Sequence, residues 1–193
     1  MALNIKETFE VEAPIEAVWA FMMDPHAVAR CMPGAELGED VDERTFEGNI
    51  KVKVGAVTTS YAGRVQFVDI DEAARHVLMT AEGKETGGGT AIGTMSSQLT
   101  TLDDGRVQVV AEASVELTGR VAQVGRGLIQ GVSHQLFLKF VDCAKRRLEA
   151  EEGSVPLDEP ENSEPVNIIP VIFRAIWSGI VNFFRRLFRR SGD

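Results

Sequence analysis

The chain has 193 residues, of which 44% are hydrophobic, and a formal net charge of −9. This length fits one domain with one sizeable core and a short additional segment, and the acidic balance excludes nucleic acid as a partner because like charges repel. The polar first residues, MALNIKETFEVEAP, predict no secretory signal. Cys31 and Cys143 are the only cysteines, so we expect two reduced, buried thiols in a reducing compartment, without metal or redox chemistry.

The N-terminal part is predicted to form one strand followed by two short helices. Apolar residues alternate with charged ones over residues 3–11, as in a half-buried strand. Pro14 is placed to open the first helix. Asp24 and Pro25 have the order of an N-cap and first-turn pair, and Pro33 ends the second helix that they open.

Further strands are predicted in series because apolar residues alternate with polar ones between short turns. They cover residues 46–54, 58–69, 76–83, 90–102 and 106–117. Strands joined in this way favour an antiparallel meander.

A long helix is predicted over residues 121–149. Its second half is apolar on one side and ends in a basic turn, which suits the negative end of a helix dipole. Its first half contains Gly125, Gly127 and Gly131, each of which costs about 1 kcal/mol relative to alanine in a helix interior. We therefore expect the first half of this helix to be locally weak.

This order of elements predicts an α+β fold in which a curved antiparallel sheet wraps around the C-terminal helix. The arrangement resembles the helix-grip fold of the START/Bet v 1-like (SRPBCC) superfamily. Over residues 3–148 the chain more closely resembles the carbon monoxide dehydrogenase G-subunit family, through Asp24-Pro25, Cys31-Met32-Pro33-Gly34-Ala35-Glu36, Gly48, Lys51, Gly55 and the glycine-rich start of the last helix. The resemblance implies that the protein recruits a molybdenum-containing carbon monoxide dehydrogenase to the cytoplasmic membrane and carries a quinone, such as menaquinone, to it.

The inward-facing positions of the predicted sheet and helix carry no charge, and small residues interrupt them. A solid core and an apolar hollow both fit this pattern, and the resemblance together with the glycines favours a hollow that binds a hydrophobic ligand. The residues expected to line it are Phe46, Ile50, Val52, Val54, Tyr61, Val65, Phe67, Met79, Met95, Leu99, Val109, Ala111, Gly125, Leu128, Val132 and Leu136. Tyr61, Thr59 or Ser97 are the candidates to orient a polar headgroup.

The sequence contains no group of residues typical of catalysis. The three histidines, His26, His76 and His134, have no metal-binding spacing, and His134 is expected on the outer face of the last helix. Gly87–Gly89 lacks the Lys-Ser/Thr of a phosphate loop and indicates a hairpin turn. Cys31 has no histidine beside it to activate the thiol. We expect a protein that is not an enzyme and that has neither a metal nor a covalent cofactor.

We expect three parts: a helix-grip ligand-binding domain at residues 1–150, a flexible linker at 151–166 and a membrane-anchoring tail at 167–193. Residues 149–165 include seven acidic residues, no basic residue and three prolines, a composition typical of an extended linker.

The tail sorts at helical spacing into an aromatic and aliphatic face and an arginine-rich face, which is typical of a helix lying in a membrane interface. The residues expected to bind the membrane are Phe173, Arg174, Ile176, Trp177, Ile180, Phe183, Phe184, Arg185, Arg186, Leu187, Phe188, Arg189 and Arg190. Residues 166–193 carry a balance of +4, which leaves −13 for residues 1–165. Spanning the bilayer, or packing into a protein groove, are the alternatives for this segment.

Taken with the resemblance, these features predict a membrane-associated accessory protein, peripheral on the cytoplasmic face, that binds a hydrophobic ligand for the enzyme. One alternative is a structural adaptor with a solid core and no ligand. Another is an enzyme or transporter for a different hydrophobic small molecule, for which the sequence offers Glu7, Arg64 and His76 as the polar groups.

Overall fold

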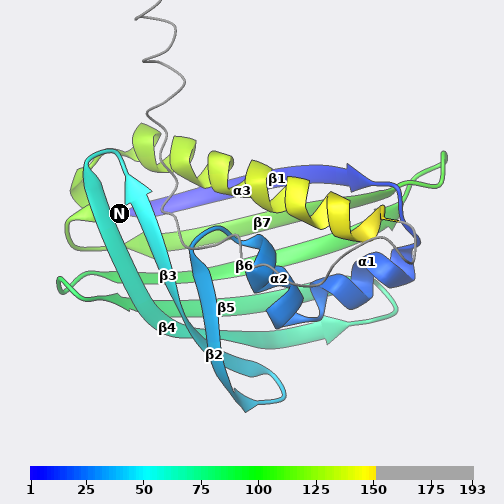
Figure 1. Cartoon of the computed structure of the whole chain (residues 1–193), viewed down its shortest axis with the longest axis horizontal. Coiled ribbons are helices and arrows are strands. Elements are labelled where there is room, and N and C mark those ends of the chain that lie inside the picture. The colour runs from blue at the N-terminus through cyan, green and yellow to red at the C-terminus, as the bar shows by residue number, and fades with distance from the viewer. Residues whose placement is uncertain (151–193) are drawn as a thin grey trace, which may run out of the picture.

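The computed structural model describes residues 1–150 and shows one antiparallel sheet with helices on its concave side (Figure 1). The elements are β1 (Ala2–Val11), α1 (Ile15–Met22), α2 (Pro25–Cys31), β2 (Ala35–Asp42), β3 (Thr45–Val54), β4 (Val57–Asp71), β5 (His76–Glu85), β6 (Thr90–Thr101), β7 (Val107–Leu117), a 3-10 turn η1 (Val121–Gln123) and α3 (Arg126–Leu148). The linker and tail expected at 151–166 and 167–193 lie outside the described residues.

The seven strands have the order β1-β7-β6-β5-β4-β3-β2, and every neighbouring pair is antiparallel. From β2 to β7 each strand therefore pairs with the next one along the chain, and β1 closes the other edge. The predicted meander and the helix-grip fold class are confirmed.

Local sequence signals position the two short helices as expected. Pro14 precedes α1. The Asp24 carboxylate accepts a hydrogen bond from the backbone N–H of Ala27 at 3.0 Å, and Pro25 occupies the first turn of α2. This capping starts α2 where the sequence predicts it.

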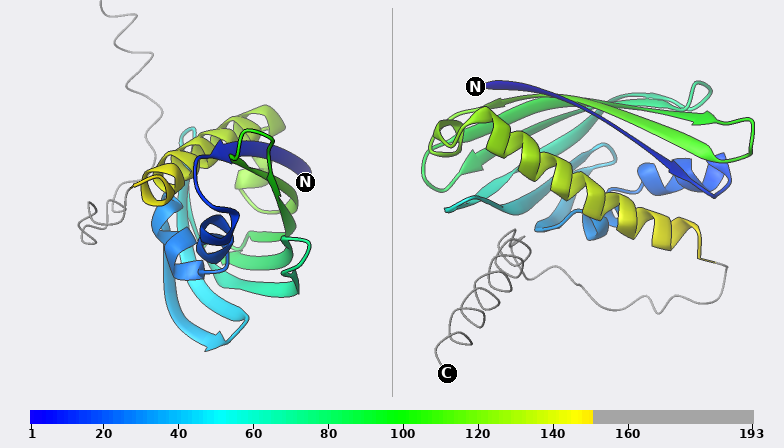
Figure 2. Two further views of the ribbon diagram at one scale, coloured as in Figure 1. Left: turned by 90° about the vertical axis from the view of Figure 1, so that its right-hand side faces the viewer. Right: turned by 90° about the horizontal axis from the view of Figure 1, so that it is seen from above.

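The sheet curls so that the helices occupy its concave, inner face, with α3 lying across the strands (Figure 2). Two glycines allow neighbouring strands to approach closely in the curl. A Cβ atom on Gly63 would lie 1.9 Å from the Glu82 carbonyl oxygen, and one on Gly48 would lie 2.5 Å from that of Glu36. A larger residue at either position would force these strands apart.

Strand β2 was not predicted from the sequence. This strand is an edge strand, exposed over most of its length, and its pairing with β3 is interrupted by two register shifts. Its carboxylates and glycine interrupt the alternation of apolar and polar residues that is typical of a half-buried strand. Charged side chains on an edge strand are typical because they prevent it from pairing with a strand of another chain.

The C-terminal helix is shorter than predicted. Residues 121–123 form the separate turn η1, and α3 begins only at Arg126. Between them Gly125 has a φ of +100°, a conformation that is strained for residues with a side chain and that interrupts the helix.

The expectation of two free thiols was wrong, because Cys31 of α2 and Cys143 of α3 form a disulfide. Their Cα atoms are 5.3 Å apart although 112 residues separate them along the chain, so no local spacing signals the pair. The bond fixes the second half of α3 to α2. Since disulfides are rare in reducing compartments, the two cysteines do not support the reducing compartment that we expected.

The apolar core is divided into two clusters. The first core cluster packs α1, α2 and the second half of α3 against one end of the sheet, with Phe9 and Phe140 among its buried residues. The second core cluster packs the first half of α3 and η1 against the opposite ends of the strands, and is built from Leu3, Val54, Leu117, Val121, Ile129 and Val132. This division leaves a part of the inner face that belongs to neither cluster.

Candidate functional site

A band across the inner face of the sheet separates the two core clusters, and we call it the middle band. The strand register places its members side by side on one face: Gly48, Ile50, Val52, Gly63, Val65, Ala81, Gly83, Gly93, Met95, Ala111 and Ala113. None of these residues belongs to either cluster. The side chains of the band are small or apolar, so only a thin layer of side chains covers the inner face of the sheet there.

Solvent reaches the middle band even though it lies on the side of the sheet that carries the helices. Val65, which faces inward on β4, is 37% exposed. Leu128 on the first half of α3 is 42% exposed. Apolar side chains of a sheet that faced a filled interior would be buried, so this face has unfilled apolar surface.

The structure divides the residues that the sequence analysis assigned to ligand binding. Six of them are buried in the core clusters: Phe46, Phe67, Leu99 and Val109 in the first, and Val54 and Val132 in the second. Met79 and Leu136 are half-buried against these clusters. The other members, Ile50, Val52, Tyr61, Val65, Met95, Ala111, Gly125 and Leu128, belong to neither cluster.

A buried polar group lies at one end of the middle band. Glu85, at the end of β5, pairs in register with Tyr61 of β4, and Thr59 is the next inward-facing residue along β4. Thr59, Tyr61 and Glu85 are 4%, 6% and 6% exposed. We call these three residues the polar cluster. One carboxylate oxygen of Glu85 accepts a hydrogen bond from Arg120 Nη2 at 3.2 Å, whereas Arg120 itself is largely exposed.

The surroundings of the polar cluster favour the ionised form of Glu85 and the neutral form of Tyr61. The nearby Thr59 hydroxyl is the main cause that lowers the pKa of the Glu85 carboxyl, and Arg120 lowers it further against the opposing effect of burial. Burial raises the pKa of the Tyr61 hydroxyl, and the negative charge of Glu85 raises it further. The cluster thus offers a carboxylate acceptor beside a phenolic donor.

Glycines around Glu85 leave the space that its carboxylate occupies. A Cβ atom on Gly89 would lie 2.6 Å from Glu85 Oε2, and one on Gly119 would lie 3.1 Å from the same atom. A Cβ atom on Gly87 would lie 2.7 Å from Arg120 Nη2. The Gly87–Gly89 segment joins β5 to β6, as the sequence predicts, and it also encloses the ion pair.

Sequence reasoning named Tyr61 and Thr59 as headgroup candidates but missed Glu85. The predicted strand ended at Gly83, two residues too early, so Glu85 lay outside it. Its position two residues beyond Gly83 continues the inward-facing alternation, and this was the available signal. Ser97, the third candidate, is 1% exposed on β6 opposite Val77 and Ala111, apart from the polar cluster.

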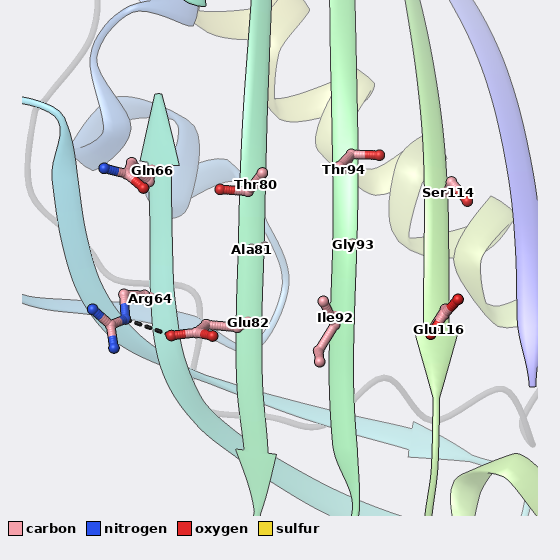
Figure 3. Close-up of a pocket in the computed structure, with 10 residues that line it drawn as sticks. All are labelled: Arg64, Gln66, Thr80, Ala81, Glu82, Ile92, Gly93, Thr94, Ser114 and Glu116. Carbon is pink, nitrogen blue, oxygen red and sulfur yellow. Dashed lines mark ion pairs between the residues drawn. The ribbon is translucent and has the colours of Figure 1, made fainter. Parts of the chain in front are cut away.

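The outer face of the sheet carries two depressions, on the side opposite the middle band. One, with a volume of about 460 Å³, is lined mainly by polar residues of β4 to β7, with the helices behind the sheet (Figure 3). Arg64 and Glu82 form an ion pair of 2.6 Å there. The second, of about 600 Å³, lies beside it towards β2 and β3. Neither depression is on the inner face, where the sequence analysis placed the ligand.

The polar residues considered for an enzyme are not brought together. Glu7 faces inward on β1 and contacts His134 Nδ1 at 2.9 Å, whereas Arg64 and His76 lie on the outer face. His134 is exposed, as expected for the outer side of the helix, and it lies where α3 approaches β1. In residues 1–150 no three His, Cys, Asp or Glu side chains are grouped to hold a metal ion. No helix of this part is long and apolar enough to span a bilayer.

Known proteins share both the sequence pattern and the fold of the described domain. The family model for CoxG, the G subunit of carbon monoxide dehydrogenase, matches residues 8–149. A search of the curated proteins gave no match.

Solved structures share the fold at low sequence identity. A conserved protein from Geobacillus kaustophilus is 24% identical, with a TM-score of 0.69, over 76% of this chain and 95% of that one. The ZhuI aromatase/cyclase from Streptomyces sp. R1128 is 16% identical, with a TM-score of 0.58, over 80% and 100% of the two chains. A START superfamily protein from Mycobacterium smegmatis is 10% identical, with a TM-score of 0.54, over 76% and 97%. At these identities the likeness concerns the fold alone.

Proposed function

The chain belongs to the carbon monoxide dehydrogenase G-subunit (CoxG) family, and from this premise we propose that it is a non-catalytic accessory protein that binds a hydrophobic ligand on the inner face of its sheet. The observation that carries the proposal is the middle band, where the apolar side chain of Val65 remains exposed between two packed clusters. A ligand lying there covers surface that the protein leaves uncovered.

The energy available from such a contact is sufficient for binding. Burial of apolar surface contributes about 25 cal/mol per Å², so a ligand that buries roughly 300 Å² gains several kcal/mol before the costs of ordering. The small residues of the band, including Gly83, Gly93 and Ala111, leave room for a ring or an isoprenoid chain against the sheet.

The finer part of the proposal is that the ligand is a quinone, such as menaquinone, and that the partner is a molybdenum-containing carbon monoxide dehydrogenase. The family name supports the partner. A quinone is apolar, dissolves in the bilayer and accepts electrons, so a carrier could transfer it between the membrane and a water-soluble enzyme.

The tail sequence supports work at the membrane surface, which we place on the cytoplasmic face. Its arginines would be attracted to the anionic lipids of that leaflet, and its aromatic residues suit the interface. An acidic linker between domain and tail would keep the domain near the membrane and raise its effective concentration there.

The direct test is to extract lipids from the full-length protein purified from bacterial membranes and to identify them by mass spectrometry. We expect a stoichiometric isoprenoid quinone, and we expect menadione, a soluble quinone, to bind in equilibrium dialysis. A protein that carries no lipid and binds no menadione would contradict the carrier function and favour a structural adaptor. Recovery of a different lipid would support ligand binding at the middle band and contradict a quinone as the ligand.

Co-sedimentation tests the partner. Carbon monoxide dehydrogenase alone should stay in the supernatant with liposomes and should pellet when the full-length protein is added. If the enzyme stays in the supernatant under both conditions, the result would contradict its recruitment to the membrane.

A further inference from the structure

The polar cluster contains hydrogen-bonding atoms that the protein itself does not use. Thr59 Oγ1, Tyr61 OH and Glu85 Oε2 are buried and have no hydrogen-bond partner of normal geometry among residues 1–150. Buried polar atoms are almost always paired, because an unpaired one loses its contact with water without replacement. The Thr59 hydroxyl lies near enough to influence the pKa of both Glu85 and Tyr61, but none of the three atoms has a partner at hydrogen-bond distance. Their unmet hydrogen bonds point to a partner from outside the protein.

The cluster adjoins the middle band along β4 and β5. On β4 and β5 the inward-facing pair Tyr61 and Glu85 is followed by Gly63 and Gly83, and then by the exposed pair Val65 and Ala81. Neither glycine has a side chain, and the Tyr61 side chain lies against Gly83, where a Cβ atom would be 3.2 Å from Tyr61 Cβ. A ligand that lies along the band therefore ends beside the Tyr61 ring, and it reaches the buried oxygens of Tyr61 and Glu85 when that ring moves aside.

The chemistry of the cluster specifies that end. The ionised Glu85 can only accept a hydrogen bond, so it requires a donor on the ligand, while the Tyr61 hydroxyl can donate to a ligand oxygen. A ketone or an ether has an acceptor and no donor. A hydroxyl group has both.

We infer that the polar cluster binds the hydroxyl end of a hydrophobic ligand, so that the site prefers a hydroxylated ring, such as a phenol or a quinol, over the corresponding carbonyl or ether compound. Tyr61 donates to the hydroxyl oxygen, and the hydroxyl hydrogen is donated to Glu85 Oε2. Arg120 remains on the other carboxylate oxygen, at 3.2 Å, and fixes the orientation of the carboxylate. This inference rests on the proposed function and adds the kind of polar group that the ligand carries.

A purely structural role accounts for less of the geometry. An ion pair that only joined the β5–β6 turn to the segment before η1 would need Glu85 and Arg120 alone. It would account for the Thr59 hydroxyl, which lowers the pKa of Glu85, but not for the buried Tyr61 hydroxyl, because phenylalanine has the same shape and would serve there.

The test compares two redox-stable probes that differ in one donor: 4-heptylphenol and its methyl ether, 4-heptylanisole. Their affinities for the full-length protein are measured by equilibrium dialysis. We expect the phenol to bind at least about tenfold more tightly, because a hydrogen bond to a charged group is among the stronger ones. Glu85→Gln should reduce this ratio several-fold, because the amide nitrogen can donate to either probe.

Two further variants separate the roles within the cluster. Tyr61→Phe removes the donor that both probes can use, so it should weaken both and leave their ratio unchanged. Thr58→Val is the matched control, since Thr58 is exposed on the opposite face of β4 beside Thr59, and it should change neither affinity. The fold of each variant is checked by circular dichroism and thermal unfolding.

The outcomes distinguish this inference from the proposed function. Equal binding of the two probes by the natural protein would contradict the polar cluster as a hydroxyl site, but it would still support ligand binding at the middle band. Binding of neither probe would contradict ligand binding at the middle band. If Glu85→Gln does not fold, the probe ratio of the natural protein and the effect of Tyr61→Phe still decide the question.

Discussion

Among single residues, Glu85 shows how a carboxylate can be placed in an otherwise apolar interior. Its side chain is 1% exposed, but Arg120 accompanies it and three glycines give its carboxylate and the Arg120 guanidinium room. A buried charge without such partners would change its protonation state instead. The ion pair with Arg120 therefore offsets part of the cost of burying this charge.

The lowered pKa of Glu85 makes part of the stability depend on pH. Because the folded-state pKa lies below the ordinary value of 4.5, ionised Glu85 stabilises the fold above that value, and the contribution is lost as pH falls through the folded pKa. We expect the difference in free energy of unfolding between the natural protein and Glu85→Gln, measured with urea, to decrease from pH 7 to pH 3. A difference that stayed constant over this range would contradict the assignment.

Among the helices and strands, α3 combines a firmly packed half with a weak one. Ile129 and Val132 anchor the first half to the second core cluster, yet Gly127 and Gly131 lie on its exposed side. The disulfide and Phe140 hold the second half in the first core cluster. The weak half lies over the side of the domain where Leu128 is exposed, so opening there would disturb little of the core.

Replacing the exposed glycines should strengthen this half. A Cβ atom on Gly131 or Gly127 would meet nothing within 4 Å, so Gly131→Ala should raise the free energy of unfolding by about 1 kcal/mol, and Gly127→Ala, nearer the helix end, by less. Gly125→Ala is the control and should destabilise, because the φ of +100° at this position strains residues with a side chain. Urea unfolding measures all three. Stabilisation by Gly125→Ala would contradict the break between η1 and α3.

The disulfide between α2 and α3 should contribute strongly to stability. It closes a long loop, since 112 residues separate the cysteines, and bonds of this kind contribute roughly 2–5 kcal/mol. The double variant Cys31→Ser, Cys143→Ser should lose stability of this order in urea unfolding. Thiol titration of the unfolded, unreduced protein should find no free thiol, because these are the only cysteines. Two titratable thiols would show that the bond does not form.

In the domain as a whole, the division of the core into two clusters is the feature on which the proposed ligand binding depends. A sheet and a helix that met along their full length would form one core with no space for a ligand. Here large side chains gather at both ends, and the middle band carries glycines and alanines. The two ends hold the fold together, and the middle remains open.

Filling the middle band should abolish ligand binding and leave the fold intact. Ala81→Phe adds a ring to the exposed inner face, and we expect at least about a tenfold loss of menadione affinity in equilibrium dialysis. Thr80→Phe adds the same ring on the outer face of β5, in the depression of Figure 3, and should bind normally. Equal affinities of the two variants would place the ligand elsewhere.

Membrane association should depend on the tail. Deleting residues 167–193 should leave a folded domain that no longer pellets with phosphatidylglycerol liposomes. Changing Arg185, Arg186, Arg189 and Arg190 to glutamate should weaken binding at least about 100-fold at low salt, since each arginine near an anionic surface contributes about 1 kcal/mol. Unchanged liposome binding after the deletion would contradict the anchor.

The fold class follows from the sequence alone. The change from a two-residue to a helical hydrophobic period, together with caps and turns such as Asp24-Pro25 and Gly55, locates nearly every element, because these signals are local consequences of backbone geometry. The edge strand β2 was missed because charges replace the alternation there, and η1 because Gly125 breaks a helix that the periodicity alone would continue.

Which residues meet depends instead on the three-dimensional arrangement. Sequence periodicity predicts that Phe46, Val65 and Ala111 face inward. Whether such a residue belongs to a core cluster or to the middle band depends on the register and curl of strands that are far apart in the chain. The same applies to Cys31 with Cys143 and to Glu85 with Arg120. Such contacts form where distant segments are brought to within a few ångströms, and no local pattern encodes that distance.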